Sequence, residues 1–112
     1  ACSKVPVKLM AKTLSAATGW SIDFNEVLKI GDRVTQLRHA FNLRCGARPE
    51  DDTLPKRILN EALADGGAKG IMVNLQPMLD EYYGLRKWDR KTGRPAREEL
   101  ERLGLSYVVA DL

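Results

Sequence analysis

The sequence has few of the residues that build metal sites or disulfide frameworks. Its 112 residues contain two cysteines, Cys2 and Cys45, and one histidine, His39. The cysteines show no Cys-x-x-Cys spacing and no histidine cluster beside them, so we expect no metal site formed within this chain alone. So few cysteines favour a reducing compartment, which we take to be the cytoplasm. A single Cys2–Cys45 disulfide is the alternative.

Long apolar runs and a strong net charge are also missing. Ile71-Met72-Val73 is typical of the longest apolar stretches, whereas a membrane-spanning helix needs about 20 such residues. The 18 Lys and Arg against 15 Asp and Glu leave a net charge of +3, which is too small to require a polyanionic partner. We therefore expect a soluble protein with no membrane partner. Because the sequence starts at Ala1 without an initiator Met, we expect a piece cut from a longer polypeptide.

No pair of segments alternates polar and apolar residues as two strands would, whereas several segments repeat apolar residues every three or four positions. The sequence therefore predicts an all-α fold in which about five helices pack around one long central helix. We expect residues 1–112 to form a single helical domain. The predicted helices cover residues 6–17, 24–44, 54–63, 74–88 and 95–103, and the tail 106–112 is ambiguous between a short helix and a strand.

The long helix, Phe24 to Arg44, organises the prediction. Asp23 occupies its N-cap position, and Glu26 three residues later completes a capping box. Its apolar residues recur at helical spacing and predict the seam of the core; they are Val27, Ile30, Val34, Leu37 and Phe41. Gly31 destabilises a helix interior by about 1 kcal/mol relative to Ala, and we interpret it as allowing the close approach of another backbone.

Eight short motifs occur in a recognisable order: Ala17-Thr18-Gly19-Trp20, Gly31-Asp32-Arg33, Phe41-Asn42-Leu43-Arg44, Asp51-Asp52-Thr53-Leu54-Pro55-Lys56-Arg57, Met78-Leu79-Asp80-Glu81-Tyr82-Tyr83, Trp88-Asp89, Thr92-Gly93-Arg94-Pro95 and Leu103-Gly104-Leu105. Together they resemble the C-terminal domain of tungsten-containing aldehyde ferredoxin oxidoreductases. The resemblance covers nearly the whole chain. It implies that the chain is the C-terminal fragment of a larger oxidoreductase, whose tungsten bis-pterin cofactor lies between domains.

The resemblance implies oxidation of an aldehyde to a carboxylate, with electrons leaving through a 4Fe-4S cluster to ferredoxin. The implied partners are the preceding domains of the same polypeptide, ferredoxin and a small aldehyde, and a homodimer is among the assemblies it allows. We expect the fragment alone to be inactive. The alternative within this resemblance is a related tungsten enzyme that reduces aromatic acyl-CoA thioesters.

The resemblance assigns one functional residue. In the family one cluster cysteine opens the C-terminal domain, and Cys2 is the only residue here placed to be that ligand, so Cys2 is both the cofactor-binding and the metal-binding prediction. A free terminal thiol is the competing interpretation. The sequence also departs from the family at Lys87, where the resemblance leads us to expect Gly before Trp88-Asp89.

Other candidates have plain structural explanations. Asp51 and Asp52 could do acid–base chemistry, but we favour helix caps or partners for Arg44 or Arg57. For His39 we favour a surface or hydrogen-bonded side chain over a proton donor. We interpret Cys45 as a buried or half-buried thiol at a helix end. The aromatic residues near position 85 are interpreted as core rather than as a cofactor box; they are Tyr82, Tyr83 and Trp88.

A basic segment beside these aromatic residues gives a competing functional class. Its members are Arg86, Lys87, Arg90, Lys91, Arg94 and Arg97. Such a cluster beside aromatic side chains could bind nucleic acid. We favour a solvated turn or a surface facing an acidic ferredoxin, so we do not expect nucleic acid as a partner.

Overall fold

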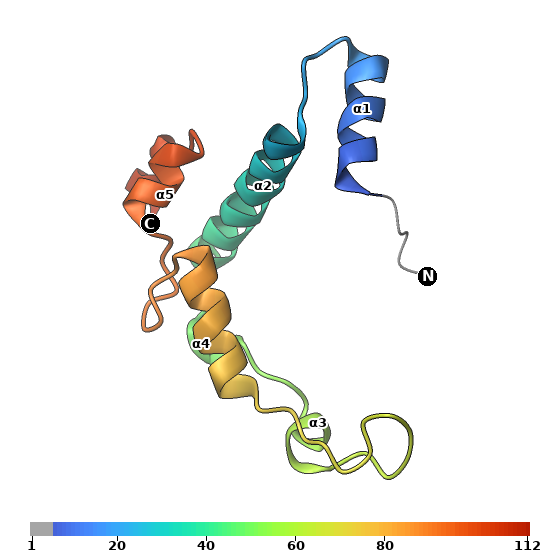
Figure 1. The fold of residues 1–112 in the computed structure, drawn as a ribbon. Helices are drawn as coiled ribbons and strands as arrows, with labels where there is room; N and C mark the ends of the chain where they lie inside the picture. Colours follow the sequence, from blue (N-terminus) through green and yellow to red (C-terminus); the bar gives the residue numbers. More distant parts are fainter. Residues whose placement is uncertain (1–5) are drawn as a thin grey trace.

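A computed structural model describes residues 6–112. Helix α2, Phe24–Arg44, runs through its centre (Figure 1). It starts where the sequence predicts, because the Asp23 carboxylate accepts a hydrogen bond of 2.8 Å from the Glu26 backbone N–H. It ends at Arg44 with Cys45 as its C-cap, and Gly46 follows in the left-handed region with φ of 94°. The predicted bounds and N-cap of the long helix are confirmed.

The other elements are helical as well: α1 Val7–Thr18, η1 Pro49–Asp51, α3 Lys56–Asn60, α4 Leu75–Arg86, α5 Arg97–Arg102 and η2 Ser106–Asp111. Within residues 6–112 there are five α-helices and two 3₁₀ helices, and β pairing is limited to isolated bridges at Leu63–Lys69 and Trp88–Pro95. The predicted all-α class with about five helices is confirmed. The ambiguous tail forms the 3₁₀ helix η2.

The short helix α3 differs most from its prediction. It covers Lys56–Asn60 rather than residues 54–63. Pro55 is its N-cap, and the residue before a proline is disfavoured in helical conformation, so Leu54 cannot extend the helix backwards. None of the α3 residues is buried. A helix of one turn without tertiary packing has little to propagate it, and the chain leaves the helix at Glu61.

The core lies at the C-terminal end of the chain. Its buried members come from α2, α5 and the start of η2; they are Ala40, Leu100, Leu103, Leu105 and Val108. Val109 and Leu112 pack against this cluster. The core therefore fixes α5 and η2 on one side of α2.

The apolar stripe of α2 is not the core seam, and that prediction is wrong. Val34 is 51% exposed and Phe41 64% exposed, and Ile30 and Leu37 are also exposed. The buried residues of α2 are Gln36 and Ala40, which the helical period of 3.6 residues places on a neighbouring face, roughly a quarter to a third of a turn from the stripe. Small and polar residues therefore make the inner face of α2, and the larger apolar residues point outward.

The arrangement is extended. The radius of gyration is 18.0 Å, whereas a compact domain of this length has about 13 Å. Figure 1 shows α1 beside one end of α2, with α4 at the other end and α3 further away. No helix formed by residues 6–112 has the combination of length and apolar character needed to cross a membrane.

Candidate functional site

An aromatic cluster forms where α2, the end of α4 and the following turn meet. The His39 ring on α2 stacks on Trp88, with ring centroids 3.3 Å apart and planes 5° from parallel. Tyr82 and Tyr83 on α4 meet Trp88 edge-on, each at 5.5 Å. Both stacked and edge-on geometries are favourable for aromatic rings. The cluster thus fixes the position of α4 against α2.

A buried amide orients this cluster. Gln36 is 2% exposed, and its Oε1 accepts a hydrogen bond of 2.7 Å from Trp88 Nε1. Its Nε2 donates to the Arg86 carbonyl at 2.9 Å. Both ends of the amide are therefore used, which avoids the cost of burying a polar group without a partner.

His39 is held in one tautomer. Its Nε2 lies 2.7 Å from the Gly93 carbonyl oxygen, and a carbonyl can only accept, so Nε2 carries the hydrogen. Burial lowers the pKa of His39 from its ordinary value of 6.5, which keeps the ring neutral at pH 7. Of the two structural roles that we favoured for His39, surface or hydrogen-bonded, the structure shows the hydrogen-bonded one.

The turn from Asp89 to Arg94 docks on α2 through Gly93. The Asp89 carboxylate accepts hydrogen bonds from the Thr92 backbone N–H at 2.7 Å and the Thr92 hydroxyl at 2.8 Å, and the Thr92 hydroxyl is the main cause that lowers the pKa of Asp89. Gly93 has φ of 74°, and a Cβ there would lie 3.0 Å from Leu43 Cδ2. The positive φ favours glycine at this position, and a larger residue would also have to displace the Leu43 side chain.

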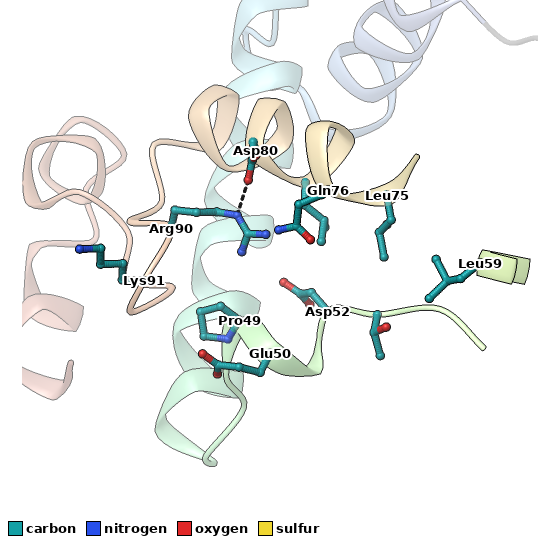
Figure 2. Close-up of a pocket in the computed structure, with 11 residues that line it drawn as sticks. Pro49, Glu50, Asp52, Leu59, Leu75, Gln76, Asp80, Arg90 and Lys91 are labelled. Atoms are coloured by element: carbon teal, nitrogen blue, oxygen red, sulfur yellow. Dashed lines mark hydrogen bonds and ion pairs between the residues drawn. The ribbon is translucent and has the colours of Figure 1, made fainter. Parts of the chain in front are cut away.

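A groove of about 670 Å³ lies between α4 and the segment around η1 (Figure 2). Figure 2 shows Arg90, Gln76 and Asp52 approaching it from different segments. Arg90 Nε donates to Asp80 at 2.7 Å, and its guanidinium carbon lies 4.7 Å from the Tyr83 ring centre. A second cavity of about 420 Å³ shares Asp52 with the first and reaches Trp88. The two cavities are therefore neighbours on either side of Asp52.

Tyr83 is buried behind Asp52 and Arg90, two residues that line the groove, and does not itself line it. It is 2% exposed, and its hydroxyl donates to the Asp52 carboxylate. Burial, and then the hydrogen bond to Asp52, raise the pKa of Tyr83 to about 12. The phenol therefore remains a protonated donor at neutral pH. The groove is lined by charged side chains. His39 and Tyr83 are not free for acid–base chemistry there, because both make structural hydrogen bonds.

A second polar cluster, which we call the charged clamp, joins α2, the end of α4 and α5. Arg86 Nη1 donates to Asp32 at 3.0 Å, and Glu99 accepts from Lys87 Nζ at 3.0 Å and from Arg102. Arg102 also lies 3.8 Å from Asp32. The hydrogen bond from Arg102, assisted by that from Lys87, lowers the pKa of Glu99 from 4.5 to about 2.

The basic segment is largely neutralised by these and similar contacts. Its ion pairs are Arg86–Asp32, Lys87–Glu99, Arg90–Asp80 and Arg97–Glu101. In the part of the chain that the structure describes, Lys91 and Arg94 have no such partner. A phosphate backbone is bound by free cationic side chains, so this segment offers less to nucleic acid than its sequence indicates.

Comparisons with known proteins connect this fold to one family. The sequence model of "Aldehyde ferredoxin oxidoreductase, domains 2 & 3" matches residues 1–105. The chain belongs to the aldehyde ferredoxin oxidoreductase family. This confirms the resemblance drawn from the sequence motifs.

Three relatives bear the name tungsten-containing aldehyde ferredoxin oxidoreductase. Those of Pyrococcus abyssi and Thermococcus kodakarensis are each 45% identical over 97 residues, which cover 86% of this chain and 16% of the relative. The Pyrococcus furiosus protein is 45% identical over 94 residues, which cover 83% of this chain and 15% of the relative. The chain therefore spans about one-sixth of the length of the curated relatives that it matches.

The described residues do not by themselves fit the tungsten or iron–sulfur groups that the aldehyde ferredoxin oxidoreductase family implies. Residues 6–112 contain no group of three or more His, Cys, Asp or Glu side chains able to hold a metal ion. Cys45 is a free, exposed thiol, so the expectation of a buried or half-buried thiol is wrong; as the C-cap of α2 it follows the last helical turn rather than packing inside it. The predicted ligand Cys2 lies outside the described residues.

Of the two acidic residues before α3, Asp51 has the helix-cap role that we favoured, although it caps η1 rather than α3, and Asp52 has a role that we did not predict. Asp51 accepts a hydrogen bond of 2.8 Å from the Arg48 backbone N–H, and Asp52 binds the Tyr83 hydroxyl. The expected partners are taken, since Arg44 pairs with Asp111 and Arg57 with Glu61. Neither aspartate caps α3, because η1 and Pro55 separate them from its first turn.

The structure shows the conformation at Lys87, the position where the family resemblance leads us to expect glycine. It is the C-cap of α4 with φ of 56°, the only non-glycine residue in the described range with positive φ. Glycine is the usual residue at such a helix end because it has no Cβ to clash. In this chain the strain at Lys87 is accompanied by its ion pair with Glu99, which glycine could not make.

Proposed function

We propose that this chain is the C-terminal helical domain of a tungsten enzyme that oxidises aldehydes to carboxylates. In this reaction an aldehyde and water yield a carboxylate, three protons and two electrons, and the electrons pass through a 4Fe-4S cluster to two ferredoxins. The observation that carries the proposal is the family match over residues 1–105, together with 45% identity to tungsten-containing aldehyde ferredoxin oxidoreductases.

In this proposal residues 6–112 act as a structural cover for a cofactor held mainly by the preceding domains of the same polypeptide. The side chains available for acid–base chemistry are already used, because His39 binds the Gly93 carbonyl and Tyr83 binds Asp52. We derive no catalytic step from them. The proposed partners are ferredoxin and a small aldehyde, the proposed location is the cytoplasm, and a homodimer is compatible with these roles.

The test uses the full-length protein. We expect it to contain tungsten and iron, and to reduce ferredoxin or a one-electron dye when an aldehyde is added. The purified chain of residues 1–112 should show neither metal nor activity. A full-length protein with intact fold but without tungsten would contradict the proposal, and aldehyde-independent reduction of an aromatic acyl-CoA thioester would assign it to the related enzymes instead.

We further propose that Cys2 is a thiolate ligand of the 4Fe-4S cluster. Such a cluster takes four thiolates, and the rest of the chain supplies only Cys45, at the far end of α2. The remaining ligands would come from another domain. In full-length Cys2→Ala, iron per tungsten and the paramagnetic signal of the reduced cluster should fall, whereas Cys45→Ala is a matched control that should change neither. Parental values in Cys2→Ala would show that Cys2 is only a free thiol.

A further inference from the structure

Tyr83 combines burial with a basic hydrogen-bond partner. Its side chain is 2% exposed, and its hydroxyl donates to the Asp52 carboxylate. A buried phenol needs an acceptor of some kind, but a carboxylate is also a base, which a backbone carbonyl is not. Asp52 is itself exposed and lines both cavities described above, so a proton that it takes from Tyr83 can exchange with solvent.

Trp88 connects this buried phenol to the surface. Its ring meets the Tyr83 ring edge-on, with centroids 5.5 Å apart. Trp88 is half-buried and lines the second cavity, so a small oxidant can approach it. Its indole N–H donates to the Gln36 amide oxygen, which accepts a hydrogen bond but is too weak a base to take the proton. An oxidised Trp88 therefore keeps its positive charge until an electron arrives from a neighbouring ring.

The charges around Tyr83 favour loss of an electron and a proton together. The Arg90 guanidinium carbon lies 4.7 Å from the centre of the Tyr83 ring, and a cation there disfavours a second positive charge on that ring. Loss of the phenolic proton to Asp52 removes this charge. Because burial and the hydrogen bond to Asp52 raise the pKa of Tyr83 to about 12, no phenolate forms in advance at neutral pH, and the proton has to leave with the electron.

Tyr82 provides an internal comparison. Its ring meets Trp88 edge-on at the same centroid distance of 5.5 Å, but its side chain is 41% exposed. In the part of the chain that the structure describes, the Tyr82 hydroxyl has no carboxylate partner, whereas the Tyr83 hydroxyl has Asp52. The two tyrosines thus offer Trp88 equal ring contact, and only Tyr83 has a base. The position of Asp52 therefore selects Tyr83 as the residue that can be oxidised with transfer of its proton.

We propose that Tyr83 and Asp52 form a proton-coupled redox site, to which Trp88 relays oxidising equivalents from one-electron oxidants of the radical class, such as nitrogen dioxide. The oxidant takes one electron from Trp88 and leaves an indole radical cation. Tyr83 then gives one electron to Trp88 and its phenolic proton to Asp52, so the products are a neutral indole, a neutral tyrosyl radical and a protonated carboxyl group. A one-electron donor such as ascorbate returns the electron, and Asp52 returns the proton. This activity goes beyond the proposed aldehyde oxidation and does not depend on it.

A fluorinated tyrosine tests the site in the full-length protein. Monofluorotyrosine replaces Tyr83 or, as the matched control, Tyr82; its phenol stays protonated at pH 7, and its fluorine splits the electron paramagnetic resonance signal of a radical at that position alone. The protein is oxidised with photogenerated tris(bipyridine)ruthenium(III), a one-electron oxidant, and frozen. We expect a split signal with the label at position 83 and less than about a tenth of it with the label at position 82. No split signal at position 83, or equal signals at both positions, would overturn the proposal.

Two substitutions in the protein labelled at position 83 separate the base from the relay. Asp52→Asn keeps an oxygen that accepts the hydrogen bond but removes the base, so the split signal should fall at least about tenfold. Trp88→Phe keeps an aromatic ring that is much harder to oxidise, so the signal should fall as well. The control Asp51→Asn removes the neighbouring carboxylate, which binds the Arg48 backbone N–H, and should leave the signal unchanged.

Each substitution can contradict its part of the proposal. An unchanged split signal in Asp52→Asn would show that Asp52 is not the proton acceptor, and an unchanged signal in Trp88→Phe would show that Trp88 is not the relay. Hydrogen exchange at the Trp88 amide, which bonds to the Tyr83 carbonyl, reports whether the end of α4 keeps its fold in each variant. The comparison of labels at positions 82 and 83 keeps both tyrosine phenols and tests the proposal without these substitutions.

Discussion

Replacing Glu99 with glutamine removes a buried carboxylate that joins α5 to the end of α4. Glu99 is 6% exposed and receives hydrogen bonds from Lys87 and Arg102. Its pKa is lowered from 4.5 to about 2, and each pKa unit corresponds to about 1.4 kcal/mol, which sets an upper value of about 3 kcal/mol. The Lys87 and Arg102 side chains are 58% and 50% exposed, so solvent screening reduces this to about 1–2 kcal/mol.

The pH dependence of this stabilisation has a definite sign. Because the folded-state pKa of Glu99 lies below the unfolded-state value, the folded protein binds fewer protons there, and its stabilisation is complete above pH 4.5. The stabilisation is lost as the pH falls from 4.5 towards about 2. The difference between the parent and Glu99→Gln should therefore be largest near neutral pH and shrink over that acidic window.

Hydrogen exchange measures this locally in the intact protein. The Leu103 amide bonds to the Glu99 carbonyl and the Leu105 amide to the Leu100 carbonyl, so their protection factors report opening of α5. Glu101→Gln is the control on the same helix, because its pair with Arg97 is exposed at 46% and 72% and should contribute less than about 0.5 kcal/mol. Equal protection in Glu99→Gln and the parent at pH 7, or an equal deficit at pH 7 and at low pH, would refute the reasoning.

Three further predictions follow from buried side chains. Leu103→Ala should destabilise α5 and η2 by about 2–5 kcal/mol, because Leu103 is 0% exposed. The control Leu85→Ala, on the exposed side of α4, should destabilise the protein by less than about 0.5 kcal/mol. Hydrogen exchange in α5 distinguishes the two variants. In an ultraviolet titration of the parent protein one tyrosine should ionise at about pH 12, and this transition should be missing in Tyr83→Phe. The stabilisation of the folded state by the protonated Tyr83 hydroxyl should be lost as the pH rises from 10 to about 12. A normal titration of every tyrosine would contradict this. The single histidine should show a ring pKa below 6.5 by NMR, with stability falling once the pH drops below 6.5 because the buried ring resists protonation; an ordinary or raised value would contradict it.

The sequence predicts local features well where the signal is itself local. The bounds of α2 follow from Asp23 at one end and Gly46 at the other, which act on backbone groups within one turn. The sequence pattern of Tyr107-Val108-Val109 suits either a strand or a helix. The contact of Val108 with Leu105 selects the helix. The length of α3 was overestimated, since an apolar pattern without anything to pack on does not sustain a helix.

The site depended on contacts that a sequence pattern does not encode. The hydrogen bonds from Trp88 to Gln36 and from Tyr83 to Asp52 join residues 52 and 31 positions apart. Nothing in the order of the residues specifies which glutamine or aspartate is used. The family resemblance identified Lys87 only as standing where glycine is expected. The structure supplies the reason for glycine there, because φ is 56°.

The two faces of α2 show what periodicity can and cannot establish. A period of 3.6 residues identifies an apolar face, but it contains no information about what covers that face. In this chain Ala40 and Gln36 face α5 and Trp88, while Phe41 and its stripe face outward. Phe41→Ala in residues 1–112 alone should therefore cost far less than the 3–5 kcal/mol typical of a core phenylalanine. An apolar face found from periodicity is therefore not by itself evidence of a core face, because the core of this helix is formed by Gln36 and Ala40 on a neighbouring face.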